Sequence, residues 1–213
     1  MNDFIYSLSE FLLTQSLPGE QAHVQASPLS YKLRSNPSDD AKKAAVLLLL
    51  IPQPNGNYTI PFISRTSNPQ DPHRGQISLP GGRKDEKDPY LAFTAFREAA
   101  EEIGVDTTQL MLMGSLSSLY IPVSKNHVFP FVALAEQNQE FKLQPSEVSD
   151  LHLFSLEKIL HPETIVTKKI NTSYAQNIEV NGFQIDDCFI WGATAMILME
   201  FKQICQSILN STR

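Results

Sequence analysis

The most informative segment of this chain is Arg97-Glu98-Ala99-Ala100-Glu101-Glu102-Ile103-Gly104-Val105. It closes a predicted helix over residues 89–103, because the apolar side chains within that range recur at helical spacing. These apolar positions are Ala92, Ala95, Phe96, Ala99 and Ile103. We expect Asp88 to cap the start of the helix ahead of Pro89. Gly104 stands where a glycine commonly ends a helix.

Three carboxylates project from one side of this predicted helix. Glu98, Glu101 and Glu102 are spaced i, i+3 and i+4, so they share a face away from the apolar stripe. They repel one another, and either the neighbouring Arg97 or a divalent cation would offset the repulsion. Hard oxygen ligands suit Mg²⁺ or Mn²⁺, and Mg²⁺ shares its coordination shell between carboxylates, water and phosphates. Taken alone, such a glutamate-rich face is more often only solvated.

A pair of glycines makes the metal-binding interpretation more specific. Leu79-Pro80-Gly81-Gly82 follows directly on a short predicted strand over residues 76–79. Glycines here let backbone amides and carbonyls approach a metal ion or a phosphate, because no side chain stands in the way. A lone Gly-Gly is equally typical of a turn. Its combination with a capped helix and three glutamates indicates a site for a phosphate-bound metal ion.

These residues together resemble the Nudix hydrolase family. The family's motif is a glycine, a carboxylate after a short loop, and then Arg-Glu-apolar-any-Glu-Glu-any-Gly-apolar. Gly82, Asp88 and residues 97–105 match it. Two features depart from the usual motif: Asp88 replaces the usual glutamate, and one extra residue lies between it and Arg97. Both departures resemble the coenzyme A pyrophosphatase-like subgroup of the family.

A segment before the motif is also similar to that subgroup. It consists of Arg65 and the run His73-Arg74-Gly75-Gln76-Ile77-Ser78-Leu79-Pro80-Gly81-Gly82. Residues 66–72 do not follow the subgroup's usual form, and Leu79 replaces a commonly aromatic residue. The motif and its preceding segment therefore cover residues 65–105.

The resemblance implies an α+β fold, an α/β/α sandwich whose mixed central sheet carries the Nudix motif as a loop–helix–loop. It also implies metal-dependent hydrolysis of a nucleoside diphosphate linked to another moiety, with Mg²⁺ or Mn²⁺ as the cofactor. The subgroup points to coenzyme A or acyl-CoA, cleaved into a phosphopantetheine and adenosine 3′,5′-bisphosphate. Another substrate of the same chemistry, such as ADP-ribose or a dinucleotide, is the first alternative. A non-catalytic nucleotide-binding regulator is the second, disfavoured because the motif is intact.

The resemblance further implies roles for individual residues. The expected metal ligands are Glu98, Glu102, Glu101 and Gly82. The expected catalytic residues are Glu101, Arg97 and Glu147, and the general base stays open between the two glutamates. Arg97 would hold the helix start through Asp88 and keep Glu98 aimed. The expected substrate-binding residues are Arg65, His73, Arg74 and Gly81. Glu147 is equally typical of an exposed loop, and the arginines of surface salt bridges.

The remaining pattern divides the chain into an N-terminal part, residues 1–42, and a Nudix hydrolase domain, residues 43–213. The first part is predicted as an amphipathic helix over residues 4–12 and an irregular stretch from residue 16. The domain is predicted to alternate strands, hairpins and helices without regular βα repetition. Strands are expected over 44–51, 58–64, 76–79, 110–119, 127–135, 148–154, 177–180 and 183–191. Asn55-Gly56 and Asn181-Gly182 are expected hairpin turns, and helices are expected over 155–160 and from Gly192.

Composition limits the partners and the location. The 213 residues contain 17 Lys and Arg against 23 Asp and Glu, a formal charge of −6. An acidic chain lacks the net basic face typical of nucleic-acid or acidic-membrane binding, so we expect a small-molecule substrate and neither of those partners. The two cysteines exclude a disulfide framework, and no signal-peptide pattern begins the sequence. The expected location is cytoplasmic, and a homodimer stays open.

Overall fold

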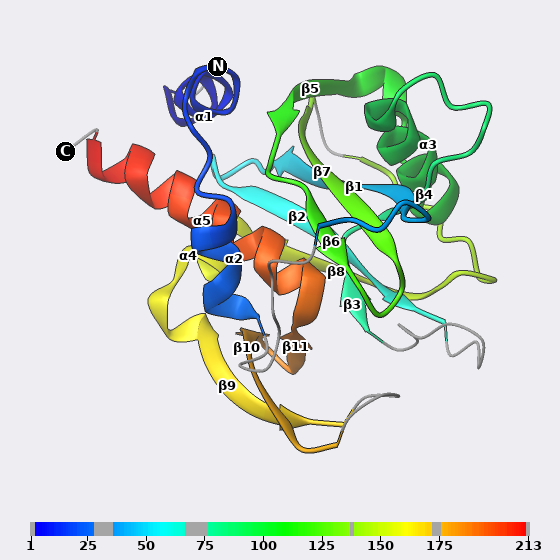
Figure 1. Cartoon of the computed structure of the whole chain (residues 1–213). Helices are drawn as coiled ribbons and strands as arrows, with labels where there is room; N and C mark the ends of the chain where they lie inside the picture. Colours follow the sequence, from blue (N-terminus) through cyan, green and yellow to red (C-terminus); the bar gives the residue numbers. More distant parts are fainter. Residues whose placement is uncertain (1–2, 28–35, 67–75, 137–138, 172–175, 212–213) are drawn as a thin grey trace.

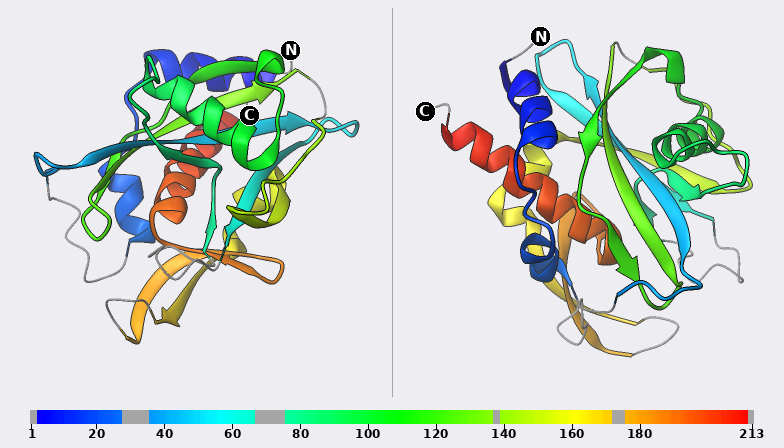
Figure 2. Two further views of the ribbon diagram at one scale, coloured as in Figure 1. Left: turned by 90° about the vertical axis from the view of Figure 1, so that its right-hand side faces the viewer. Right: turned by 45° about the horizontal axis from the view of Figure 1, so that its top comes forward.

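The computed structural model describes residues 3–27, 36–66, 76–136, 139–171 and 176–211. These residues form a three-layer sandwich in which a mixed sheet lies between helices (Figure 1). One helix, α3 (Leu91–Ile103), covers one face of the sheet. The helices α1 (Asp3–Thr14) and α5 (Gly192–Ser211) cover the other face (Figure 2). The predicted α+β sandwich is confirmed.

The central strand β1 (Lys42–Pro52) explains why the chain needs helices on both faces. Its run of leucines is buried throughout, and successive side chains point to opposite faces of the sheet. Leu48 and Leu50 pack in the apolar core with α5, whereas Leu47 and Leu49 pack in a second core with α3. A continuous apolar run is therefore the pattern that a strand buried on both faces requires.

The other strands extend the sheet from β1 in both directions. On one side β1 is parallel to β7 (Asn126–Ala135), which pairs with β5 (Leu110–Ser115) and β6 (Leu119–Ile121). On the other side it is antiparallel to β2 (Tyr58–Arg65), which pairs with β3 (Ile77–Ser78) and β8 (Val148–Ser155). The predicted Asn55-Gly56 turn joins β1 and β2, and Gly56 has a φ of +82° there.

A short strand, β4 (Gly81–Arg83), pairs antiparallel with β1 directly beside α3. Its register places Gly82 opposite Ala45 and Gly81 opposite Val46. A Cβ on Gly81 would collide with the carbonyl oxygen of Ala45, and its φ is +150°. Glycine is therefore required at position 81 for β4 to lie this close to β1.

The start of α3 differs from the prediction. The helix begins at Leu91 with Tyr90 as its N-cap residue, and no side chain caps it. Asp88 lies outside the helix and is buried, and its carboxylate accepts hydrogen bonds from Arg97, Thr94 and the Asp85 amide. The N-cap assignment of Asp88 was wrong because the Arg97 guanidinium is a stronger partner for a carboxylate than the helix amides. The predicted end at Gly104 is confirmed, with φ at +74°.

The second predicted hairpin turn was also wrong. Asn181-Gly182 lies inside β10 (Ile178–Ile185), which pairs with β9 (Ile165–Ile170) and β11 (Cys188–Ile190) in a separate sheet. The turn occurs at residues 186–187, where Asp186 adopts a φ of +50°. Gly182 instead allows β11 to lie close to β10, because a Cβ there would collide with the Ile190 carbonyl oxygen and the Phe189 ring.

The N-terminal part contains more structure than predicted. A second helix, α2 (Glu20–Ala26), forms within the stretch expected to be irregular and packs against α5. The short helix α4 (Leu156–Leu160) is confirmed near its predicted place. Two 3₁₀ turns, Thr107–Gln109 and Pro162–Thr164, complete the helical elements of the described residues.

No helix in the described part of the chain combines the length and the apolar character needed to cross a membrane.

A buried carboxylate ties the N-terminal part to the sandwich. Glu200, in the middle of α5, is fully buried. It accepts hydrogen bonds from the Gly19 amide at 3.0 Å and the Ser117 hydroxyl at 2.6 Å, and its other oxygen lies 3.0 Å from His23 Nε2. Burial alone would raise the pKa of Glu200, but the bonds from His23 and Ser117 outweigh it and hold the pKa below its ordinary value.

We predict that Glu200→Ala lowers the free energy of unfolding by about 2–4 kcal/mol, because the amides of Gly19 and Ser117, the Ser117 hydroxyl and the His23 ring would lose their carboxylate partner. Urea denaturation at pH 7 measures this. Since the folded-state pKa is depressed, the contribution of Glu200 is present above its unfolded pKa and is lost as the pH falls through the folded one. Glu10→Ala, at an exposed position of α1, is the control and should leave stability within about 0.5 kcal/mol of wild type. Equal stability of both variants would contradict the role of Glu200.

Candidate active site

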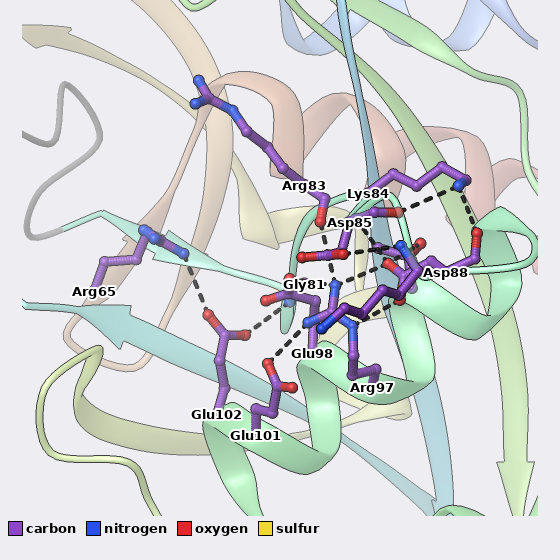
Figure 3. Close-up of polar contacts among 12 residues, drawn as sticks. Arg65, Gly81, Arg83, Lys84, Asp85, Asp88, Arg97, Glu98, Glu101 and Glu102 are labelled. Atoms are coloured by element: carbon purple, nitrogen blue, oxygen red, sulfur yellow. Dashed lines mark hydrogen bonds and ion pairs between the residues drawn. The ribbon is translucent and has the colours of Figure 1, made fainter.

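The side of α3 that faces β4 carries the two glutamates at i and i+4. The apolar stripe of the helix packs in the core through Ala95, Ala99 and Ile103. The stripe fixes the rotation of the helix, and this rotation turns Glu98 and Glu102 toward Gly81 and Gly82 (Figure 3). The sequence periodicity of α3 therefore positions both carboxylates.

Glu102 is the most deeply buried of the three glutamates on α3. Its side chain is 1% exposed, and its Oε2 accepts a hydrogen bond from the Gly81 amide at 2.8 Å. Its other oxygen pairs with Arg65 Nη1 at 3.3 Å. Burial raises the pKa of Glu102 to about 7, although the Gly81 amide and the Arg65 charge oppose the shift. A second positive charge beside this carboxylate would relieve the cost of keeping it ionised.

Glu98 lies one turn earlier and packs against the backbone of Gly82. A Cβ at position 82 would collide with the Glu98 carboxylate, so a larger residue there would displace this side chain. The side chain of Glu98 is 15% exposed and pairs with Arg97 at 2.9 Å. Burial raises the pKa of Glu98, while the Arg97 charge lowers it and leaves a net upward shift.

A third carboxylate reaches the same point from a distant loop. Glu147 precedes β8, and an oxygen from each of Glu98, Glu102 and Glu147 lies within 4.8 Å of the others. The backbone holds this loop in place, because the Glu147 carbonyl accepts from the Thr66 amide at 3.0 Å and the Glu102 carbonyl accepts from the Gln144 amide at 3.0 Å. Three converging hard oxygen donors fit a divalent cation such as Mg²⁺ or Mn²⁺.

Arg97 links Glu98 to a further pair of carboxylates, those of Asp88 and Glu101, on the outer side of α3. Arg97 binds Asp88 through two bonds of 2.9 Å and also pairs with Glu101 at 2.8 Å (Figure 3). The hydrogen bond to Asp88 raises the pKa of Arg97, and Arg97 in turn holds the pKa of Asp88 well below its ordinary value. This pair ties the loop before α3 to the helix, as the sequence led us to expect for Arg97.

The carboxylates lie at the wall of a cavity of about 530 Å³. Its polar lining includes Arg65, Arg83, Asn126 and Glu147. Its apolar lining comes mainly from the two strands β1 and β7, the loop after β6 and the start of α5, through Val46, Val123, Val128, Trp191, Met196 and Ile197. A charged wall facing an apolar one suits a substrate with one anionic and one less polar part.

The structure brings together most of the residues that the sequence singled out. Glu98, Glu102, Glu147, Arg65, Gly81 and Gly82 all line the cavity. Glu101 is directed to Arg97 instead, and its side chain is 56% exposed. His73 and Arg74 lie outside the described residues. Arg83 and the first turn of α5 line the cavity too, although no sequence pattern indicated either.

One protein family combines this sandwich fold with these glycines and glutamates. A model of the NUDIX domain matches residues 41–174. The chain belongs to the Nudix family. It is an enzyme of that family, a Nudix hydrolase, and enzymes of this kind generally use divalent metal ions.

Similar proteins support this assignment. The uncharacterized Nudix hydrolase NudL of Yersinia pestis (strain Pestoides F) is 31% identical over 162 residues, which are 76% of this chain and 79% of NudL. NudL of Yersinia pseudotuberculosis serotype O:1b (strain IP 31758) matches to the same extent. The crystal structure of a MutT/nudix family protein from Enterococcus faecalis has a TM-score of 0.51 at 18% identity, covering 81% of this chain and 65% of that protein. This likeness supports the fold.

We predict that Glu102→Gln stabilises the metal-free protein at neutral pH, by about 2–3 kcal/mol at most. A carboxyl whose folded-state pKa is raised destabilises the fold when it must ionise. The gain should therefore be absent below the ordinary pKa of glutamate, grow with pH and level off above about pH 7. Urea denaturation in the presence of a chelator measures it across this range.

Glu101→Gln is the matched control on the same helix. Its side chain is mostly exposed, so the same substitution there should show no such rise. A stability difference for Glu102→Gln that does not change with pH would contradict the explanation by burial.

Proposed function

We propose that this Nudix hydrolase uses Mg²⁺ or Mn²⁺ to hydrolyse the diphosphate bond of coenzyme A or an acyl-CoA, giving a phosphopantetheine and adenosine 3′,5′-bisphosphate. The observation that carries the proposal is the convergence of Glu98, Glu102 and Glu147 at the wall of the cavity. A diphosphate is a polyanion, so an acidic wall can hold it only with cations between the two. The resemblance of residue 65 and of residues 73–82 to the coenzyme A pyrophosphatase-like subgroup supports the substrate.

In this proposal the carboxylates bind the metal ion, and neighbouring groups orient the carboxylates. The bound ion would neutralise charge on the phosphate oxygens during attack by water. Glu98, Glu102 and Glu147 would hold it through their oxygens, and the Gly82 backbone is a further expected ligand. The Gly81 amide orients Glu102, and Arg97 orients Glu98 from the other side. Arg65 is in reach of both Glu102 and the cavity, so its guanidinium is the proposed phosphate contact within the described residues. His73 and Arg74 remain predicted contacts.

The proposed general base is Glu147 in preference to Glu101. The carboxylate of Glu147 converges with those of Glu98 and Glu102 and lines the cavity, so it can accept a proton from water beside the diphosphate. Glu101 is held by Arg97, and its carboxylate is on the solvent side of the helix. Glu101 then supports the position of Arg97.

The apolar wall of the cavity supports a substrate with an extended, weakly polar arm. Val46, Val128, Met196 and Ile197 offer hydrocarbon surface within the same space as the carboxylates. The pantetheine arm or acyl chain of an acyl-CoA can bury apolar area there, which a second sugar would not.

The first test is turnover. We expect the protein to release adenosine 3′,5′-bisphosphate from coenzyme A in MgCl₂ or MnCl₂ and to release none with a chelator, as measured by liquid chromatography. Glu98→Gln and Glu102→Gln should each lower kcat at least about 100-fold, because each removes a proposed metal ligand. Turnover of ADP-ribose or a dinucleotide but not of coenzyme A would move the assignment to the other substrate class. If neither wild type nor the variants hydrolyse any of these substrates, a non-catalytic binding role would be favoured.

The second test separates the two candidate bases. We predict that Glu147→Gln lowers kcat by about 10²–10⁴-fold, whereas Glu101→Gln lowers it by about tenfold or less. Isothermal titration with Mn²⁺ shows whether lost activity reflects lost metal affinity. A larger loss for Glu101→Gln would contradict the assignment of Glu147.

A further inference from the structure

Arg83 is a guanidinium in the cavity that the proposed reaction does not use. It follows Gly82 at the end of β4, it is exposed, and it lines the cavity. Its Nε donates a hydrogen bond of 3.3 Å to Asn126 Oδ1, which is a neutral partner. In the described ranges, no carboxylate forms an ion pair with Arg83. Its charge is therefore available to an anion that enters the cavity.

The other two arginines near the carboxylates are engaged with acidic side chains. Arg65 pairs with Glu102, and Arg97 pairs with Asp88, Glu98 and Glu101. Arg83 differs from both, because its side chain runs away from the carboxylates of α3 (Figure 3). Its positive charge therefore lies at a part of the cavity away from the acidic cluster.

Other cavity residues add hydrogen-bonding capacity for an anionic group. Ser124 also lines the cavity, and its buried Oγ has no hydrogen-bond partner among the described residues. The first turn of α5 lines the same cavity, and helix N-termini favour negative charge. Thr194 in that turn is 9% exposed and makes no side-chain hydrogen bond within the described part of the chain. Buried polar groups normally have partners, so partnerless groups at a cavity indicate a polar ligand.

We propose that Arg83 is a specificity-determining residue that binds a second phosphate of the substrate, a monoester outside the diphosphate bridge. This inference rests on the proposed function and narrows its substrate class to nucleoside diphosphate derivatives that carry a further phosphate. A guanidinium group can bind two phosphate oxygens at once. Asn126, which accepts the Arg83 hydrogen bond, and Ser124 line the same cavity and can contribute further hydrogen bonds. The metal-binding carboxylates and Arg83 then hold two separate phosphate groups of one molecule.

Binding of two nucleotides that differ by one phosphate tests the inference without catalysis. Isothermal titration in MgCl₂ compares adenosine 3′,5′-bisphosphate with adenosine 5′-monophosphate. Wild type should bind the bisphosphate at least about tenfold more tightly, and Arg83→Gln should reduce this preference to about twofold or less. Lys87→Gln removes the same charge from the loop that follows β4, outside the cavity lining, and it should keep the wild-type preference. Equal binding of both nucleotides by wild type, or an unchanged preference in Arg83→Gln, would overturn the inference.

Turnover distinguishes this inference from the proposed function. The ratio of kcat/KM for coenzyme A to that for 3′-dephospho-coenzyme A should fall about tenfold in Arg83→Gln and stay unchanged in Lys87→Gln. A variant that loses activity equally on both substrates would show that Arg83 contacts the diphosphate itself, and the inference would be wrong. A wild-type protein that cleaves neither substrate contradicts the proposed function alone, and the binding preference then decides the role of Arg83. A circular dichroism spectrum checks that each variant is folded.

Discussion

The contact between α3 and β4 is the constraint on which the site depends. Two glycines bring the backbone of β4 against the helix, where the Gly81 amide binds Glu102 and the bare Cα of Gly82 leaves room for Glu98. A Cβ at position 81 would collide with the backbone of β1, and a Cβ at position 82 would displace the Glu98 carboxylate. Ala95 and Ala99 of the same helix pack in the core with Leu47 and Leu49 of β1. One helix therefore contributes both to packing and to the site.

At this interface the negative charge of Glu98 and Glu102 exceeds the positive charge beside it, which favours binding of a cation. Burial raises the pKa of Glu98 and Glu102, and the nearest arginines compensate only in part. Arg97 is held by Asp88 on the outer side of the helix, and Arg65 reaches a single oxygen of Glu102. Carboxyl groups with a shifted pKa are common at functional sites. A bound divalent ion would favour the ionised form of both glutamates and so lower their pKa values.

The cavity combines segments that are far apart in the chain. The carboxylates come from α3 and the loop before β8, the apolar surface from β1, β7 and α5, and one further guanidinium from β4. Parallel pairing of β1 with β7 and the return of α5 across the sheet bring these segments to one place. Glu200 anchors the N-terminal part to the middle of α5, so the helix that lines the cavity is held on its far side as well.

The sequence by itself determined the local parts: the helix with its apolar stripe, the glycine pair, Glu98 and Glu102 on one face, and the doubly buried strand at 44–51. Each depends on the spacing of neighbouring residues, which the backbone geometry of a helix or strand converts directly into a shared face. Asp88 and Asn181-Gly182 were misassigned because a distant partner, a guanidinium in one case and a neighbouring strand in the other, outweighed the local preference. Only the tertiary structure decided that Glu147 joins the glutamates, that Glu101 turns to Arg97, and that Arg83 lines the cavity without an ion pair to any carboxylate of the described residues. Such contacts join residues whose separation along the chain carries no periodic signal, so they follow from how the layers pack.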